Sequence, residues 1–160
     1  MEVEPRIKNK KLLGFVVTSV DIPDGVTHIE KSAFSRCSSL KSVTIPNSVD
    51  SIGTSAFYDC SSLKSINIPD GVTYICRDAF YGCTSLTSVN IPGSITRIGR
   101  CAFSGCSSLT SLTIPDSVEY IGDGAFSGCT SLRSIKVPKH FDAEAVKLWG
   151  LPDTCEIVRD

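Results

Sequence analysis

The stretch IPDGVTYICRDAFYGCTSLTSVN, residues 68–90, is one copy of a pattern that fills most of this 160-residue chain. Six prolines follow one another at a strict interval of 23 residues: Pro23, Pro46, Pro69, Pro92, Pro115 and Pro138. A fixed period of this size is typical of solenoids and propellers. A propeller blade contains four strands and needs about 40 residues, so the short period predicts a solenoid.

Three further features recur in phase with the prolines. An Ala-Phe pair begins at Ala33, Ala56, Ala79, Ala102 and Ala125; a cysteine follows at Cys37, Cys60, Cys83, Cys106 and Cys129; a leucine follows at Leu40, Leu63, Leu86, Leu109 and Leu132. Five full units therefore run from residue 23 to residue 137.

Within one unit, the spacing of apolar residues indicates what each segment does. LKSVTIP, residues 40–46, alternates apolar and small polar residues, which predicts a short strand with one buried face. Pro46 has no N–H group and so ends the strand. A turn and a second apolar pair, Val49 and Ile52, come next. The remainder of the unit is predicted to form one helical or 3₁₀ turn that ends near Cys60.

One unit directs about eight side chains inward, and stacked units bury them in a continuous core. In the first unit these side chains are Val26, Ile29, Ala33, Phe34, Cys37, Leu40, Val43 and Ile45. Parallel strand pairing would place successive coils about 4.8 Å apart.

The two ends of an open solenoid need covers. We expect residues 1–22 to form an N-terminal cap and partial repeat, residues 23–137 the five repeats, and residues 138–160 a C-terminal cap. Asp142 is a good N-cap for a helix in AEAVKLW, and Gly150 is a good stop. The residues expected to cover the two ends are Leu12, Leu13 and Phe15 at the front and Val146, Leu148, Trp149 and Leu151 at the back.

Five of the eight cysteines share one inward position, where a free thiol behaves as a small hydrophobic group. Cys76, Cys101 and Cys155 are out of phase. Cys76 and Cys101 fall one coil apart, so a disulfide between them is an alternative to free thiols. No C-x-x-C pair is present, and we expect no metal site. So many thiols fit a reducing setting better than an oxidising one.

The sequence contains few features expected of an enzyme or of a nucleic-acid-binding protein. The net charge is -1, which argues against nucleic acid. No apolar run is long enough to cross a bilayer. His28 and His140 are the only neutral-pH bases and lie about five coils apart. No P-loop, nucleophile elbow or zinc-binding helix occurs. We therefore expect no catalytic residue, no cofactor and no metal.

Two outward surfaces are candidates for binding. The strand face carries Lys41, Lys64 and Arg133 among small polar residues, and the alternative is an ordinary solvated face. The second surface is a lateral column at the second apolar pair, which is richer in the residue types that dominate binding hot spots. Its members are His28, Ser51, Tyr74, Arg97 and Tyr120, followed on the next turn by Tyr58 and Tyr81. These residues are alternatively ordinary flanks of a short strand.

The unit Leu-x-x-Val/Ile-x-Ile-Pro-x-x-Val-x-x-Ile-x-x-x-Ala-Phe-x-x-Cys-x-x-Leu resembles the BspA-like leucine-rich repeat from residue 17 to residue 137. The resemblance implies an α/β repeat solenoid: a right-handed leucine-rich-repeat superhelix with a parallel strand on the concave face and short helical or 3₁₀ turns on the convex face. The asparagine of many leucine-rich repeats is replaced here by Gly25, Ser48, Gly71, Ser94 and Ser117. We therefore expect no asparagine ladder, and we expect the cysteine column to fill part of its space.

The same resemblance implies a non-catalytic recognition or adhesion module of a microbial or protist protein, at the cell surface or secreted. Its partner would be a protein, such as a host or surface protein, or a glycan, and we expect a monomer. The start of the chain is not a signal peptide as written. Two alternatives stay open: a cytoplasmic scaffold that holds partner proteins together, and a structural spacer from a longer repeat array.

Overall fold

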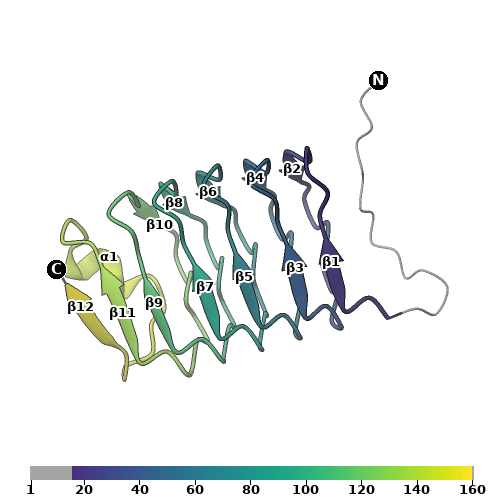
Figure 1. The fold of residues 1–160 in the computed structure, drawn as a ribbon. Helices are drawn as coiled ribbons and strands as arrows, with labels where there is room; N and C mark the ends of the chain where they lie inside the picture. The colour runs from purple at the N-terminus through teal and green to yellow at the C-terminus, as the bar shows by residue number, and fades with distance from the viewer. Residues whose placement is uncertain (1–15, 160) are drawn as a thin grey trace.

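The computed structural model describes residues 16–159 as a parallel β-solenoid (Figure 1). The predicted N-terminal cover residues Leu12, Leu13 and Phe15 lie outside this range. The main strands stand side by side in chain order: β1 (Ser19–Asp21), β3 (Ser42–Thr44), β5 (Ser65–Asn67), β7 (Ser88–Asn90), β9 (Ser111–Thr113) and β11 (Ser134–Val137).

A second row of two-residue strands runs beside the main row (Figure 1). It consists of β2 (His28–Ile29), β4 (Ser51–Ile52), β6 (Tyr74–Ile75), β8 (Arg97–Ile98) and β10 (Tyr120–Ile121), which form one sheet. The main row consists of three separate sheets, β1–β3, β5–β7 and β9–β11 with one further strand. Where strands of successive repeats pair, in either row, the paired residues are 23 positions apart, as in Ser19 with Ser42 and His28 with Ser51. The repeat period therefore sets the register, and the predicted solenoid is confirmed.

A stack of phenylalanines runs through the core. Successive ring centroids lie 5.1 to 5.9 Å apart, and neighbouring rings are within 8° of parallel, in the series Phe34, Phe57, Phe80, Phe103 and Phe126. The Ala-Phe residues of the second to fifth coils are fully buried. In the first unit Val26, Ala33, Cys37 and Val43 pack against the core but are only half-buried.

The turn after each short strand differs in detail from the predicted helical or 3₁₀ turn. The Ala56 N–H donates to the Gly53 carbonyl (3.1 Å), which is a bond of 3₁₀ type. The next N–H, of Phe57, instead donates to Ala79 of the following coil (2.8 Å). Ser55 also has a positive φ of 55°, which no helix of L-residues maintains. The segment is therefore a run of turns whose N–H groups bond alternately within and between coils.

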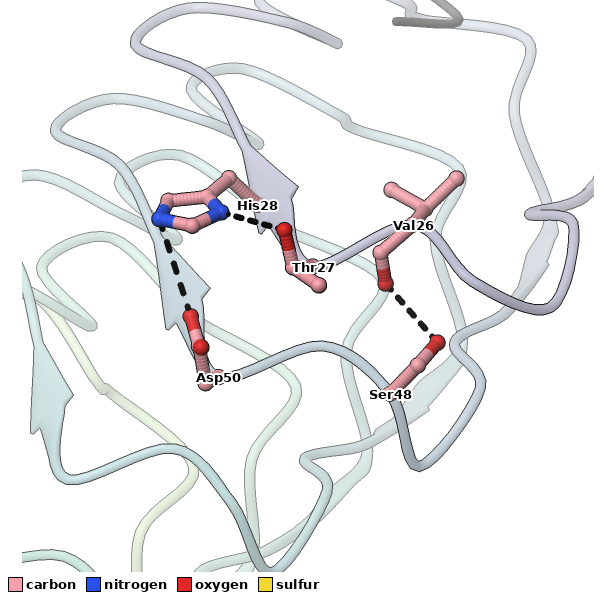
Figure 2. Close-up of polar contacts among 5 residues, drawn as sticks. All are labelled: Val26, Thr27, His28, Ser48 and Asp50. Carbon is pink, nitrogen blue, oxygen red and sulfur yellow. Dashed lines mark hydrogen bonds and ion pairs between the residues drawn. The ribbon is translucent and has the colours of Figure 1, made fainter. Parts of the chain in front are cut away.

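Serines replace the missing asparagine ladder. The Ser48 hydroxyl donates to the Val26 carbonyl of the preceding coil at 2.8 Å (Figure 2). Ser94 and Ser117, at the same position of later coils, make the equivalent bonds to the Val72 and Ile95 carbonyls at 2.6 and 2.7 Å. His140 continues the series, with Nε2 2.8 Å from the Val118 carbonyl. Each rung spans 22 residues, so these side chains link adjacent coils as an asparagine ladder would.

The cysteine column forms a second set of rungs. The thiols of Cys60, Cys83, Cys106 and Cys129 lie 3.1 to 3.3 Å from the phenylalanine carbonyl 26 residues earlier and donate to it. Burial raises the pKa of all four thiols. They therefore stay protonated, as the donating role requires. None of the eight cysteines forms a disulfide, so the alternative of a Cys76–Cys101 bond is not realised.

The backbones of successive coils approach closely at a column of glycines beside the second strand row. An added Cβ would lie 2.6 Å from the Lys31 nitrogen at Gly53, 2.6 Å from the Arg77 nitrogen at Gly99, and 2.4 Å from the Arg100 nitrogen at Gly122. The N–H of each glycine donates to an isoleucine carbonyl of the preceding coil. A side chain at these positions must therefore push two backbones apart.

We expect Gly99→Ala to lower the free energy of unfolding by about 1–3 kcal/mol, because the new methyl group cannot fit without separating the coils. Denaturant titration followed by circular dichroism measures the change. The matched control is Gly93→Ala: an added Cβ there meets no atom within 4 Å, so stability should change little. Equal effects of the two substitutions would show that the close approach at Gly99 imposes no constraint.

The C-terminal end is covered as predicted by a short helix and a tryptophan. Helix α1 (Ala143–Lys147) starts at Asp142, whose carboxylate accepts from the Ala145 N–H at 2.8 Å. Trp149 is only 1% exposed. It meets the Phe126 ring edge-on, with centroids 6.4 Å apart, and so closes the phenylalanine stack.

Two details of this end differ from the sequence prediction. Leu148 is 60% exposed and does not cover the last coil, because α1 leads its side chain into solvent while its carbonyl accepts from the Gly124 N–H. A further strand, β12 (Glu156–Arg159), pairs in parallel with β11 and extends the main row by one strand (Figure 1). The sequence analysis did not predict this strand.

Candidate interaction surface

The lateral column is assembled by the second strand row. Each of its residues opens one of these strands, and the register places Tyr74 beside Arg97 and Arg97 beside Tyr120. Alternation along a strand buries the following isoleucine and turns the first side chain outward. Tyr74 and Tyr120 are 42% and 49% exposed. Coil stacking therefore holds two exposed tyrosines on either side of an arginine.

Arg97 and Tyr120 are in direct contact. The guanidinium carbon of Arg97 lies 5.5 Å from the centroid of the Tyr120 ring, within the range of a cation–π interaction. Such a contact limits the conformations of a long side chain without neutralising its charge. The Arg97 guanidinium is thus positioned and still able to bind an anion.

His28 stands at the N-terminal end of the column and is held by polar neighbours (Figure 2). Its Nδ1 lies 2.6 Å from the Thr27 hydroxyl oxygen, and its Nε2 lies 3.8 Å from an Asp50 carboxylate oxygen of the next coil. His28 is separated from Tyr74 by the intervening Ser51 and does not touch the Arg97–Tyr120 pair.

The other predicted tyrosines form a separate feature. The rings of Tyr58 and Tyr81 stack with centroids 4.8 Å apart and 5° between their planes. Desolvation, and then the Asp59 carboxylate, raise the pKa of Tyr58, so its phenol stays protonated at neutral pH. Beside Tyr58 lies a shallow depression of about 370 Å³, lined by Ser32, Ser35, Arg36, Ser55 and Tyr58.

The three cationic residues predicted on the strand face are exposed but dispersed. Lys41 and Lys64 occupy neighbouring coils, and Arg133 lies three coils beyond Lys64. Between them the face carries threonines, serines and asparagines, such as Asn90, whose side chain donates to Asn67 at 3.4 Å. This surface is therefore evenly polar, whereas the lateral column concentrates aromatic and cationic groups.

Two residues beside the column were missed in the sequence analysis. Arg77 and Arg100 are exposed, follow β6 and β8 by two residues, and are exactly one period apart in the sequence. Their 23-residue spacing was the signal that could have identified them as neighbours. In the structure the Asp78 N–H donates to the Arg100 carbonyl (3.1 Å), which brings the two arginine backbones together.

The described part of the chain shows no arrangement suited to a metal or a membrane span. Residues 16–159 contain no group of three or more His, Cys, Asp and Glu side chains placed to hold a metal ion. Within the same range, no helix combines the length and hydropathy that crossing a bilayer requires.

Comparison with known proteins agrees with the fold. Residues 6–133 match the model of the BspA type leucine rich repeat region in six copies. The chain belongs to this family. Members of the BspA-type family are repeat proteins of the leucine-rich class, whose domains generally bind other proteins. No curated protein is significantly similar to the sequence.

Solved structures of bacterial leucine-rich repeat proteins are similar to this BspA-type chain. The protein TpLRR of T. pallidum is 33% identical, with a TM-score of 0.73 over 89% of this chain and 74% of its own. A leucine-rich repeat protein from Bacteroides ovatus is 32% identical, with a TM-score of 0.69 over 89% of this chain. The present chain covers 48% of that protein, so it spans only about half of its length.

Proposed function

We propose that this chain is a non-catalytic recognition module that binds a protein partner at the cell surface, as an adhesin does, through its lateral column. The observation that supports this function is the exposed, in-register series Tyr74, Arg97 and Tyr120. Tyrosine and arginine are the residue types most enriched in binding hot spots. The buried core of the stacked coils fixes the backbone that carries these side chains, so no ordering of a loop has to accompany binding.

The same column would also serve a cytoplasmic scaffold, which is the second candidate function. Eight cysteines without a disulfide favour that candidate, because disulfides usually form in secreted proteins. The family and the surface chemistry support binding in both cases, and location distinguishes the two functions. A structural spacer would make no use of an exposed tyrosine–arginine column.

The binding role is tested by site-specific photo-crosslinking in the native organism. The photoreactive residue p-benzoylphenylalanine replaces Tyr74 or Tyr120, and in matched controls it replaces Ser88 or Ser111 on the strand face. We expect a discrete cross-linked protein from the two tyrosine positions and none from the two serine positions. Adducts that form only at the serines, or at no position, would overturn the proposed surface.

Surface protease shaving of the same cells tests the location. Intact, unlysed cells are treated with protease, and the released peptides are identified by mass spectrometry. Recovery of peptides from residues 16–159 supports the surface recognition module. Release of these peptides only after lysis would reject the surface recognition module and leave the cytoplasmic scaffold as the candidate function.

A further inference from the structure

Three exposed arginines lie on two adjacent coils, at or just after the short strands of the lateral column, and we call them the positive patch. Arg77 belongs to the coil of β6, and Arg97 and Arg100 belong to the coil of β8. Arg77 Nε donates to an Asp78 carboxylate oxygen at 3.1 Å. Among the described residues, neither Arg97 nor Arg100 is in an ion pair. Two guanidinium groups therefore remain available to an external anion, although the whole chain carries a net charge of -1.

Acidic residues limit this patch at both ends of the column. The preceding coil exposes Asp50, and the following coil exposes Glu119 and Asp123. The positive surface is therefore two coils wide, or about 10 Å at the spacing of paired parallel strands. Tyr74 and Tyr120 flank it with exposed aromatic rings.

We infer that this patch binds a short acidic segment of the partner, in extended conformation and with two or three carboxylates. The inference rests on the proposed function and names the chemistry that the lateral column recognises. Guanidinium groups pair with carboxylates through two parallel hydrogen bonds, which a lysine cannot match. An extended peptide advances about 3.3 Å per residue, so three residues span the two coils.

The dimensions of the patch favour a peptide over a long polyanion. A nucleic acid or a sulfated glycan carries regularly repeated charges and binds along a continuous positive track. Here Asp50 on one side and Glu119 on the other would repel such a chain within one coil of the arginines. A short acidic segment has its charges only where the guanidinium groups lie, and its apolar or aromatic residues can contact the tyrosines.

A peptide titration tests the inference on the purified chain. The probe is the fluorescein-labelled hexapeptide Gly-Glu-Tyr-Glu-Glu-Gly, and its binding is followed by fluorescence anisotropy at low salt. We expect the double variant Arg97→Gln/Arg100→Gln to bind about tenfold more weakly than wild type, because exposed ion pairs contribute modestly and additively here. The matched control Lys139→Gln/Lys147→Gln removes the same charge far from the patch and should bind as wild type does.

Two competitor probes define the ligand class. The isosteric peptide Gly-Gln-Tyr-Gln-Gln-Gly should not bind, and a sulfated heparin hexasaccharide should not displace the acidic peptide. Three results would each overturn the inference. The arginine and lysine double variants could bind the acidic peptide with equal affinity, the glutamine peptide could bind as tightly as the acidic peptide, or the hexasaccharide could displace the acidic peptide. The inference and the proposed function can fail separately. If the photoreactive residue at position 74 cross-links a protein equally well with and without the arginine double substitution, the proposed recognition function stands and the acidic-segment inference falls.

Discussion

Raising the pH from about 9 to about 11 is expected to destabilise this protein steeply, because the cysteine rungs must keep their protons in the folded state. An unfolded cysteine has a pKa of about 8.5. Burial raises the pKa of Cys83 and Cys129 to about 12 and raises that of Cys60 and Cys106 strongly as well. Between the pKa of the unfolded cysteines and the raised pKa of the folded ones, the unfolded chain releases thiol protons that the folded chain retains.

The sign and size of the effect follow from proton linkage. A raised folded-state pKa contributes stability that is present below about pH 8.5 and is lost as the pH rises toward the folded pKa. Each buried thiol should lower the free energy of unfolding by about 1.4 kcal/mol per pH unit in this window. Four thiols together give about 5 kcal/mol per unit, which is enough to unfold a typical domain within two pH units.

Denaturant titrations at a series of pH values measure this slope. Tyrosine and lysine ionisation also contributes at high pH, but it is common to wild type and to the variant Cys83→Ala/Cys106→Ala. Removing two thiols should therefore reduce the slope by about 2.7 kcal/mol per pH unit, even though the variant is less stable at neutral pH. Identical slopes in the two proteins would mean that the thiols ionise without unfolding, and the buried rungs would then not be the cause.

The sequence was sufficient to predict the strands of the repeats, their register and the core, because all three depend on which side chains avoid water. Val49, Ile52 and Phe57 recur every 23 residues, and only a stack of coils buries them all at once. The hydrogen bonds of the outer turn were not predictable in the same way. The Phe57 N–H donates to the Ala79 carbonyl of the next coil and not to a carbonyl of its own coil, and this depends on how closely the coils approach.

The C-terminal cap shows why the end of the repeat was harder to predict than its interior. The proline period stops at Pro138, yet Trp149 lies 23 residues after Phe126 and His140 lies 23 residues after Ser117. Both continue a column in the structure with a different residue type. A search for identical residues every 23 positions misses such substitutions. A search for inward-facing positions every 23 residues, whatever the residue type, would have found them.

The lateral column was predictable as a list of residues but not as a set of contacts. Period alone places Tyr74, Arg97 and Tyr120 in a row. That Arg97 lies over Tyr120 depends on side-chain conformations, which the sequence does not determine. Arg77 and Arg100 could not be found from the strand positions, because each lies two residues after the end of its strand.

Truncation of the cap tryptophan should lower the free energy of unfolding nearly as much as truncation of a central core residue does. Trp149 is 1% exposed, faces the last ring of the phenylalanine stack, and packs edge-on against Phe141 with centroids 5.0 Å apart. We expect Trp149→Ala to lower the free energy of unfolding by about 3–5 kcal/mol, because it opens a cavity and exposes Phe126. Denaturant titration measures the loss. Leu148→Ala is the matched control: its side chain is largely exposed, so the change should stay within about 0.5 kcal/mol.

Hydrogen exchange distinguishes a cap from an ordinary core residue in this variant. In a solenoid each coil contacts only its neighbours, so damage at one end should propagate from that end. Amide protection in Trp149→Ala should therefore fall first in the coil of β10 and β11, whereas the amides of β3 and β5 should lose protection only with global unfolding. A uniform loss of protection along all coils would show that the solenoid unfolds as one cooperative unit and that Trp149 stabilises it as a whole.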